Sequence, residues 1–224
     1  MPKVSFVIPA FRDTWLRMAV ASLLNQTMED VEVLIFNNNH LDINCKDERV
    51  RVFDTPGYAP PRCYNEARRL ARSHFILPST DDDWWLAERA LISYEYLTRG
   101  WDYIAGSCLI TNELGVIKTY NVVKPFTLER QKYYANTISL PFIGYKKDVV
   151  PDYDESFKIC YDYLFHLQCG LKDLKMQTLR TTLGYKREWE GSLYKSFPRE
   201  DIRKEIDRIR VMFNDTEIRR RDFK

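Results

Sequence analysis

Glycine is scarce in this sequence, and its distribution excludes two common phosphate-binding loops. The 224 residues include only eight glycines, and the first of them is Gly57. A P-loop or a GxGxxG turn needs glycines where the first strand meets the first helix, because a side chain there would keep the phosphate away from the backbone. The N-terminal strand-to-helix connection is therefore neither of these motifs.

The chain also lacks a dominant charge, paired cysteines and a long apolar run. Thirty-four basic and thirty-two acidic residues leave a net charge of +2, which argues against a nucleic-acid-binding protein. The five cysteines are widely spaced, without a CxxC pair, which is typical of reduced thiols in an intracellular protein and not of disulfides or a zinc site. No stretch approaches 18 uninterrupted apolar residues, and no signal-peptide core follows Met1-Pro2-Lys3. We therefore expect a cytoplasmic protein without a transmembrane segment.

The first hundred residues predict an α/β arrangement with parallel strands. Short apolar runs alternate with segments whose apolar residues recur at helical spacing. We expect strands at 4–8, 31–36, 50–53 and 75–77, and helices from about 16 to 24, 62 to 73 and 86 to 98. Ligands of parallel sheets bind beyond the carboxyl ends of the strands. This rule places the residues that follow the first two strands, including Phe11 and Asn37, on one rim.

After residue 100 the pattern indicates antiparallel strands and further helices. A turn at Asn112-Glu113-Leu114-Gly115 predicts a hairpin of strands 103–110 and 116–122. We expect a helix at 128–135, a strand at 138–143, a helix from about 161 to Gly170, and a last strand within 176–185. The polar segment 186–192 is expected to be mobile. We interpret residues 1–197 as one domain with halves 1–100 and 101–197, and 198–224 as an amphipathic helical tail that docks on the domain or contacts a membrane or partner.

Three successive carboxylates, Asp81, Asp82 and Asp83, follow the strand at 75–77. Adjacent like charges repel one another, so a fold that gathers them at the end of a buried strand usually supplies a cation. This predicts a divalent metal site. The alternative is a solvated acidic turn that caps the helix beginning near Leu86, since Asp is a good N-cap.

Five motifs resemble those of the family 2 glycosyltransferases with a GT-A fold. They occur in the family's order and spacing between residues 4 and 195, which makes the set far more specific than any one motif. The matching stretches are Val4 to Phe11, Ala21 to Thr27, Ser79 to Trp84, Pro151 to Glu155 with Tyr161 to Tyr163, and Tyr185 to Ser192. The resemblance implies an α/β fold with a Rossmann-like nucleotide-binding half, a mixed and mostly parallel sheet, and a smaller antiparallel acceptor-side region.

The resemblance also implies roles for individual residues. A sugar nucleotide would bind with Mn²⁺ or Mg²⁺ on its diphosphate, because hard oxygen ligands favour these ions. Asp82 and Asp83 are then the candidate metal ligands, with Asp81 nearer the ribose. The predicted nucleotide-binding residues are Pro9, Phe11, Asp13, Asn37, Arg62, Asn65, Asp81, Asp82 and Arg187. Arg187 or Lys186 would close over the phosphates.

Asp162 is the predicted general base of an inverting transfer. Such a reaction needs a carboxylate on the acceptor side to take the hydroxyl proton as the oxygen attacks the anomeric carbon. The alternative role for Asp162 is a helix N-cap. Trp84, Trp85 and Trp189 offer flat faces to sugar rings or belong to the core.

The sequence departs from the family pattern at Asn37-Asn38, where the family has two aspartates. An amide accepts a hydrogen bond as a carboxylate does, but it lacks the charge, so the base of the donor is left open. We expect a UDP-sugar donor, a glycan or glycolipid acceptor, and possible peripheral membrane contact through the C-terminal helix. The alternatives are a non-catalytic nucleotide-sugar or glycan-binding module, a nucleotidylyltransferase, which needs a glycine-rich first loop, and a nuclease.

Overall fold

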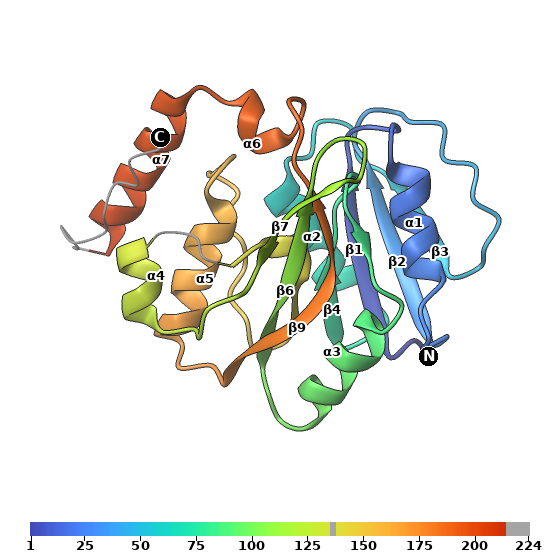
Figure 1. Ribbon diagram of the computed structural model, residues 1–224, viewed down its shortest axis with the longest axis horizontal. Helices are drawn as coiled ribbons and strands as arrows, with labels where there is room; N and C mark the ends of the chain where they lie inside the picture. The colour runs from blue at the N-terminus through green and yellow to red at the C-terminus, as the bar shows by residue number, and fades with distance from the viewer. Residues whose placement is uncertain (135–137, 214–224) are drawn as a thin grey trace.

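A mixed β-sheet forms the centre of the molecule (Figure 1). The computed structural model describes residues 1–134 and 138–213. Within these residues nine strands follow the order β3-β2-β1-β4-β8-β6-β9-β5, with β7 paired to β6. Their bounds are β1 (Val4–Ala10), β2 (Val31–Asn37), β3 (Val50–Asp54), β4 (Phe75–Pro78), β5 (Trp84–Trp85), β6 (Tyr103–Thr111), β7 (Ile117–Asn121), β8 (Ile143–Lys146) and β9 (Met176–Arg187).

The N-terminal half has the expected parallel arrangement. β1 pairs in parallel with β2 and with β4, and β2 pairs in parallel with β3. Every residue of β1 and β2 is buried, as expected for strands covered on both faces. Three strand ends thus meet at one rim, and Ala10 lies opposite Asn37 there.

The second half continues the same sheet. β8 is antiparallel to β4 and β6, and the expected hairpin of β6 and β7 is confirmed. The expected strand at 138–143 was wrong, because Leu140–Phe142 form the 3₁₀ helix η1 around Pro141, and β8 begins only at Ile143. Gly144 lies where an added Cβ would be 2.5 Å from a Leu77 methyl carbon, so β8 packs closely against the neighbouring strand. β9 pairs in parallel with β6 and antiparallel with β5, a two-residue strand that the sequence did not indicate.

Helices cover both faces of the sheet (Figure 1). The alternation of strand residues separates two cores: Val7 and Ile76 belong to one cluster, whereas Phe6, Ile8 and Leu77 belong to the other. The first cluster packs against α2 and α5, and the second against α1. The helices are α1 (Leu16–Leu24), α2 (Pro60–Leu70), α3 (Arg89–Thr98), α4 (Leu128–Tyr134), α5 (Tyr161–Leu171), α6 (Leu193–Ser196) and α7 (Arg199–Met212).

Two helix boundaries differ from the expected ones for local reasons. α2 begins at Pro60 because proline fits the first helical positions, and it ends at Leu70 because Ala71 is extended. α3 begins at Arg89 because Trp84 and Trp85 form β5.

The C-terminal helix packs on the domain. Ile202, Ile206 and Ile209 of α7 belong to the same apolar cluster as the α5 residues Leu164 and Phe165. The docked-helix interpretation is therefore confirmed for α7, and the remainder of the expected tail, 214–224, lies outside the described residues. None of the helices described has both the length and the apolar character needed to cross a membrane.

Candidate functional site

The candidate site lies where β1, β2 and β4 end. Phe11 and Arg12 follow β1, Asn37 ends β2, and the aspartates follow β4. Backbone hydrogen bonds fix this rim: the Asn38 N–H donates to the Ala10 carbonyl at 2.9 Å, and the Ser79 N–H donates to the Val7 carbonyl at 2.8 Å. The rim therefore continues the backbone hydrogen bonding of the parallel sheet.

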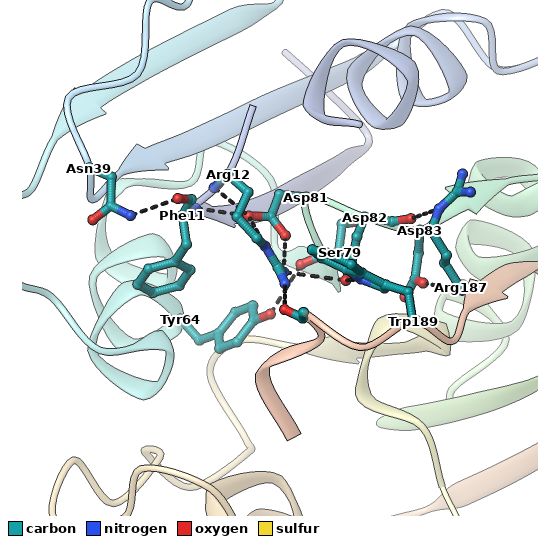
Figure 2. Close-up of polar contacts among 11 residues, drawn as sticks. Phe11, Arg12, Asn39, Tyr64, Ser79, Asp81, Asp82, Asp83, Arg187 and Trp189 are labelled. Carbon is teal, nitrogen blue, oxygen red and sulfur yellow. Dashed lines mark hydrogen bonds and ion pairs between the residues drawn. The ribbon is translucent and has the colours of Figure 1, made fainter. Parts of the chain in front are cut away.

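Asp81 is bound on both of its oxygens (Figure 2). Its Oδ2 accepts the backbone N–H groups of Phe11 and Arg12 at 2.8 and 2.9 Å, and its Oδ1 accepts Arg12 Nη2 at 2.5 Å. Burial raises the pKa of Asp81, although the Arg12 guanidinium opposes the rise. For Arg12, burial acts to lower the pKa, but the hydrogen bond and charge of Asp81 outweigh it and leave the pKa raised. Arg12 is therefore the counter-ion of Asp81.

Asp82 joins this pair to the loop that follows β9. Its Oδ2 accepts the indole Nε1–H of Trp189 at 3.0 Å and lies 3.3 Å from Arg12 Nη2. Arg12 Nη1 donates to the Gly191 carbonyl at 2.7 Å, and its guanidinium lies 5.2 Å from the Trp189 ring centroid. The polar segment 186–192, expected to be mobile, is thus hydrogen-bonded to the loop that carries Asp81, Asp82 and Asp83 (the acidic loop), and its mobility stays a prediction.

Asp83 is buried at the base of the acidic loop, where its Oδ1 accepts the backbone N–H of Arg187 at 2.8 Å. Burial, with the neighbouring Asp82 carboxylate, raises the pKa of Asp83 to about 7. A buried arginine beneath the loop offsets part of this charge. Arg89 is fully buried and donates to Pro78 O at 2.6 Å and to Ser79 Oγ at 3.0 Å. Burial lowers its pKa to about 9, against the charge of Asp83.

The Arg187 side chain points away from the Asp81 and Arg12 pair (Figure 2). Its Nε donates to the Asp82 carbonyl at 3.1 Å and its Nη1 donates to the Glu113 carbonyl. The guanidinium lies 4.4 Å from the Trp15 ring centroid and 4.8 Å from that of Trp84. Arg187 therefore joins the acidic loop to the β6–β7 hairpin, and a role on the phosphates would require its side chain to leave these contacts.

The candidate base-pocket residues differ in how they are held. Pro9 is buried within β1, and Asp13 is exposed on the connection to α1. Asn37 folds the loop after β2: its Nδ2 donates to Leu41 O at 3.0 Å and its Oδ1 accepts the Leu41 N–H at 2.9 Å. Asn39 reaches across the rim and donates to the Phe11 carbonyl at 2.6 Å. The structure thus brings Phe11 to the aspartates and commits the Asn37 amide to its own loop.

The two candidate residues of α2 also have defined partners. Arg62 is exposed and stacks on Tyr58, with its guanidinium 3.9 Å from the ring centroid. Asn65 is 9% exposed and binds the backbone of Tyr153 in both directions, at 2.9 and 2.8 Å. Its Nδ2 also lies 3.0 Å from Glu155 Oε1. In this structure Asn65 joins α2 to the segment that leads into α5.

Asp162 lies in the first turn of α5. The N-cap residue is Cys160, and the Asp162 Oδ1 accepts the N–H of the next residue, Tyr163, at 2.8 Å. Tyr64 links this region to the rim. Its ring lies 6.4 Å from that of Tyr161, and its hydroxyl donates to the Ser79 carbonyl at 3.1 Å. The predicted base is thus connected through two buried tyrosines to the loop that carries the aspartates.

A divalent cation fits this donor set only if substrate or water supplies further ligands. Among the described residues, no three His, Cys, Asp or Glu side chains converge as a metal-binding group. Asp81 is committed to Arg12 and to backbone N–H groups, whereas Asp82 and Asp83 are adjacent buried carboxylates whose charges repel. Mg²⁺ is commonly bound by one or two carboxylates, with waters and phosphates completing its shell. The residues therefore fit an ion shared with a diphosphate.

Several residues of this network could not be identified from the sequence. Arg12 occurs directly after the first strand, and that position was its only signal. Arg89 lies beside the apolar stripe of α3 and would be expected in solvent, yet it is fully buried. Trp15 packs edge-on against Trp189, with ring centroids 4.6 Å apart, although the two residues are far apart in the sequence.

Known proteins match this chain in sequence and in fold. The family model described as glycosyl transferase family 2 matches residues 5–149. A GalNAc(5)-diNAcBac-PP-undecaprenol beta-1,3-glucosyltransferase of Campylobacter jejuni is 26% identical over 132 residues. That match covers 54% of this chain and 43% of the relative, so the chain spans less than half of the relative's length.

Solved structures of S. aureus TarS share the fold. Residues 1–349 of TarS in complex with UDP-GlcNAc superpose with a TM-score of 0.71 at 18% identity, covering 93% of this chain and 66% of that one. The complex with UDP gives a TM-score of 0.66 at the same identity. At this identity the likeness concerns the fold alone, and it confirms the expected α/β class with a GT-A-type mixed sheet.

Proposed function

Because this chain belongs to glycosyl transferase family 2, we propose that it is an inverting, metal-dependent glycosyltransferase that uses a UDP-sugar. The observation that supports the proposal is that Asp81, Asp82 and Asp83 follow β4 at the strand-end rim, while a further carboxylate, Asp162, lies in the first turn of α5. This arrangement provides carboxylates for a diphosphate-bound cation and a separate carboxylate for the acceptor hydroxyl. A binding module without catalysis would need only the carboxylates for the cation.

The chemistry divides between the two groups of carboxylates. Asp162 takes the proton of the acceptor hydroxyl as its oxygen bonds to the anomeric carbon, on the face opposite the leaving diphosphate. Asp82 and Asp83 would hold Mn²⁺ or Mg²⁺, and the bound ion would supply positive charge for the leaving diphosphate. Trp189 and Arg12 hold the loop 188–192 over Asp82, where it would exclude water from the donor.

The relatives support the proposed donor and acceptor classes. TarS was solved with UDP-GlcNAc and with UDP, which supports a UDP-linked donor. The named activity of the Campylobacter relative supports a glycan on a lipid diphosphate carrier as acceptor. Such an acceptor would place the enzyme at a membrane surface.

Nucleotide binding tests the donor part of this proposal. UDP, GDP, CDP and dTDP are each added with and without Mn²⁺, and the midpoint of thermal unfolding (Tm) is measured. A ligand at a hundred times its Kd stabilises the fold by about 2.7 kcal/mol, so we expect UDP with Mn²⁺ to raise Tm by roughly 5–11 °C. Asp83→Asn should remove the Mn²⁺-dependent part of the rise, whereas Asp173→Asn, an exposed aspartate after α5, should not. If no diphosphate stabilises the protein in a metal-dependent way, the proposal fails.

A further inference from the structure

Three successive backbone N–H groups before α5 converge on one carboxylate of α7. Glu205 Oε1 accepts the N–H of Lys158 at 2.8 Å, and its Oε2 accepts those of Ile159 and Cys160 at 3.0 and 2.7 Å. Glu205 is 9% exposed. Convergent N–H groups at a helix N-terminus form an anion-binding site, and here a side chain from the C-terminal helix fills it.

The same helix holds the residues just before this site. Arg208 donates to the backbone carbonyl of Ser156 at 3.2 Å and to its hydroxyl at 2.9 Å. Its guanidinium also lies 4.2 Å from the Phe157 ring centroid. Contacts from α7 therefore extend from Ser156 to Cys160, which is the residue before α5 begins.

We propose that Glu205 is a positioning residue for Asp162. This inference rests on the proposed function, in which Asp162 is the base. Asp162 lies two residues after the last N–H that Glu205 binds, so the backbone held by Glu205 sets the direction of the first turn of α5. The α5 N-cap residue Cys160 makes no side-chain capping hydrogen bond. Glu205 instead accepts the N–H groups of Cys160 and of the two residues before it, so it fixes the chain where it enters the first turn. α7 thus belongs to the catalytic half of the enzyme.

Glu205→Gln tests the proposal with little change in volume. The amide replaces one accepting oxygen by an N–H₂ group, which cannot accept from a backbone N–H. We expect kcat for UDP release from UDP-glucose or UDP-GlcNAc, with water as acceptor, to fall at least tenfold. The donor KM and the Tm rise with UDP and Mn²⁺ should stay within twofold and 2 °C of the wild-type values, since the rim is untouched. The amide hydrogens of residues 158–160 should exchange faster.

Two further variants guard against a general folding defect. Glu200→Gln makes the same change on the exposed face of α7 and should leave kcat unchanged. Glu205→Asp keeps the charge on a side chain shorter by one methylene, so its kcat should lie between those of the wild type and Glu205→Gln. If Glu205→Gln does not fold, Glu205→Asp still decides: a wild-type kcat with unchanged exchange at 158–160 overturns the inference.

A double-mutant cycle separates positioning from other effects. If Glu205 acts through Asp162, Glu205→Gln should change kcat less than twofold when Asp162→Asn is already present. An equal fall in both backgrounds would overturn the inference, as would a wild-type kcat in Glu205→Gln alone. The proposed function fails separately, because in that case Asp162→Asn itself would keep the wild-type kcat.

Discussion

The acidic loop after β4 and the segment before α5 are held in opposite ways. In the acidic loop, carboxylates that belong to the loop accept hydrogen bonds from backbone N–H groups and arginines of other elements. Before α5, the backbone N–H groups belong to the segment, and the accepting side chains come from α2 and α7. The first arrangement concentrates negative charge that a ligand can use, whereas the second only fixes a conformation. Substitutions in the two regions should therefore differ in their effects on activity, ligand binding and stability.

The largest expected effect separates catalysis from donor binding. Asp162→Asn keeps the side-chain shape and removes the proton acceptor, and general-base catalysis contributes roughly 10²–10⁴-fold. We expect a loss of that size in kcat for UDP-sugar turnover, with UDP affinity within about twofold of wild type. Asp173→Asn is the matched control. Wild-type turnover by Asp162→Asn would show that Asp162 is not the general base.

Loss of the counter-ion should disturb the acidic loop most strongly. Arg12→Met leaves Asp81 buried without its cation, and breaking a buried pair on one side costs about 3 kcal/mol. This corresponds to a fall in Tm of roughly 6–12 °C. Added Mn²⁺ should recover more stability in Arg12→Met than in the wild type, since the charge is no longer neutralised. An Arg12→Met protein as stable as wild type would show that Arg12 does not hold the loop.

In the segment before α5, Asn65→Ala should reduce the free energy of unfolding with little change in UDP affinity. The substitution leaves both backbone groups of Tyr153 without their partner, which costs about 2 kcal/mol by chemical unfolding. Glu66→Ala, the next residue on α2, is the control. UDP affinity measured by calorimetry distinguishes the two roles considered for Asn65. A fall of tenfold or more would indicate direct contact with the nucleotide.

The smallest expected effect is a dependence of stability on pH. Burial and Asp82 raise the folded-state pKa of Asp83 to about 7, above its unfolded value of 3.8. The folded protein therefore holds a proton that the unfolded chain has lost, and stability declines as pH rises from about 4 to 7. Asp83→Asn removes this decline, so without metal its Tm advantage over the wild type should be greater at pH 8 than at pH 5, by a few degrees. An equal Tm difference at both pH values would contradict the raised pKa of Asp83 in the folded protein.

The sequence was sufficient for the elements whose local pattern agrees with their burial. β1 and β2 are short, mostly apolar runs, and the strands end where Phe11 and Asn37 were expected at a common rim. It was insufficient where tertiary contact decides the structure. Trp84 and Trp85 form a strand only because β9 lies beside them, and Pro141 interrupts a segment whose composition favours β structure.

In the candidate site, too, the sequence indicates local features but not those that depend on tertiary contacts. The three aspartates could be placed at a strand end, but their separate environments depend on residues far along the chain. Asp81 is set apart by Arg12, 69 positions earlier, and Asp83 by the Arg187 backbone, 104 positions later. No periodicity in the sequence indicates such pairs. The separate environments of Asp81 and Asp83 therefore arise only in the folded chain.

The parallel pairing of β6 with β9 has a consequence for the order of folding. It joins residues 103–111 to residues 176–187, and the Asp83 to Arg187 hydrogen bond lies at the end of the same strand. Long loops must close before such contacts form, and this slows the step in which they appear. On the ribosome, the early parallel strands are complete long before residue 187 is made. The growing chain would thus carry Asp82 and Asp83 without their Trp189 and Arg187 partners until β9 and the residues after it are made, and the acidic loop would be among the last parts of the fold to close.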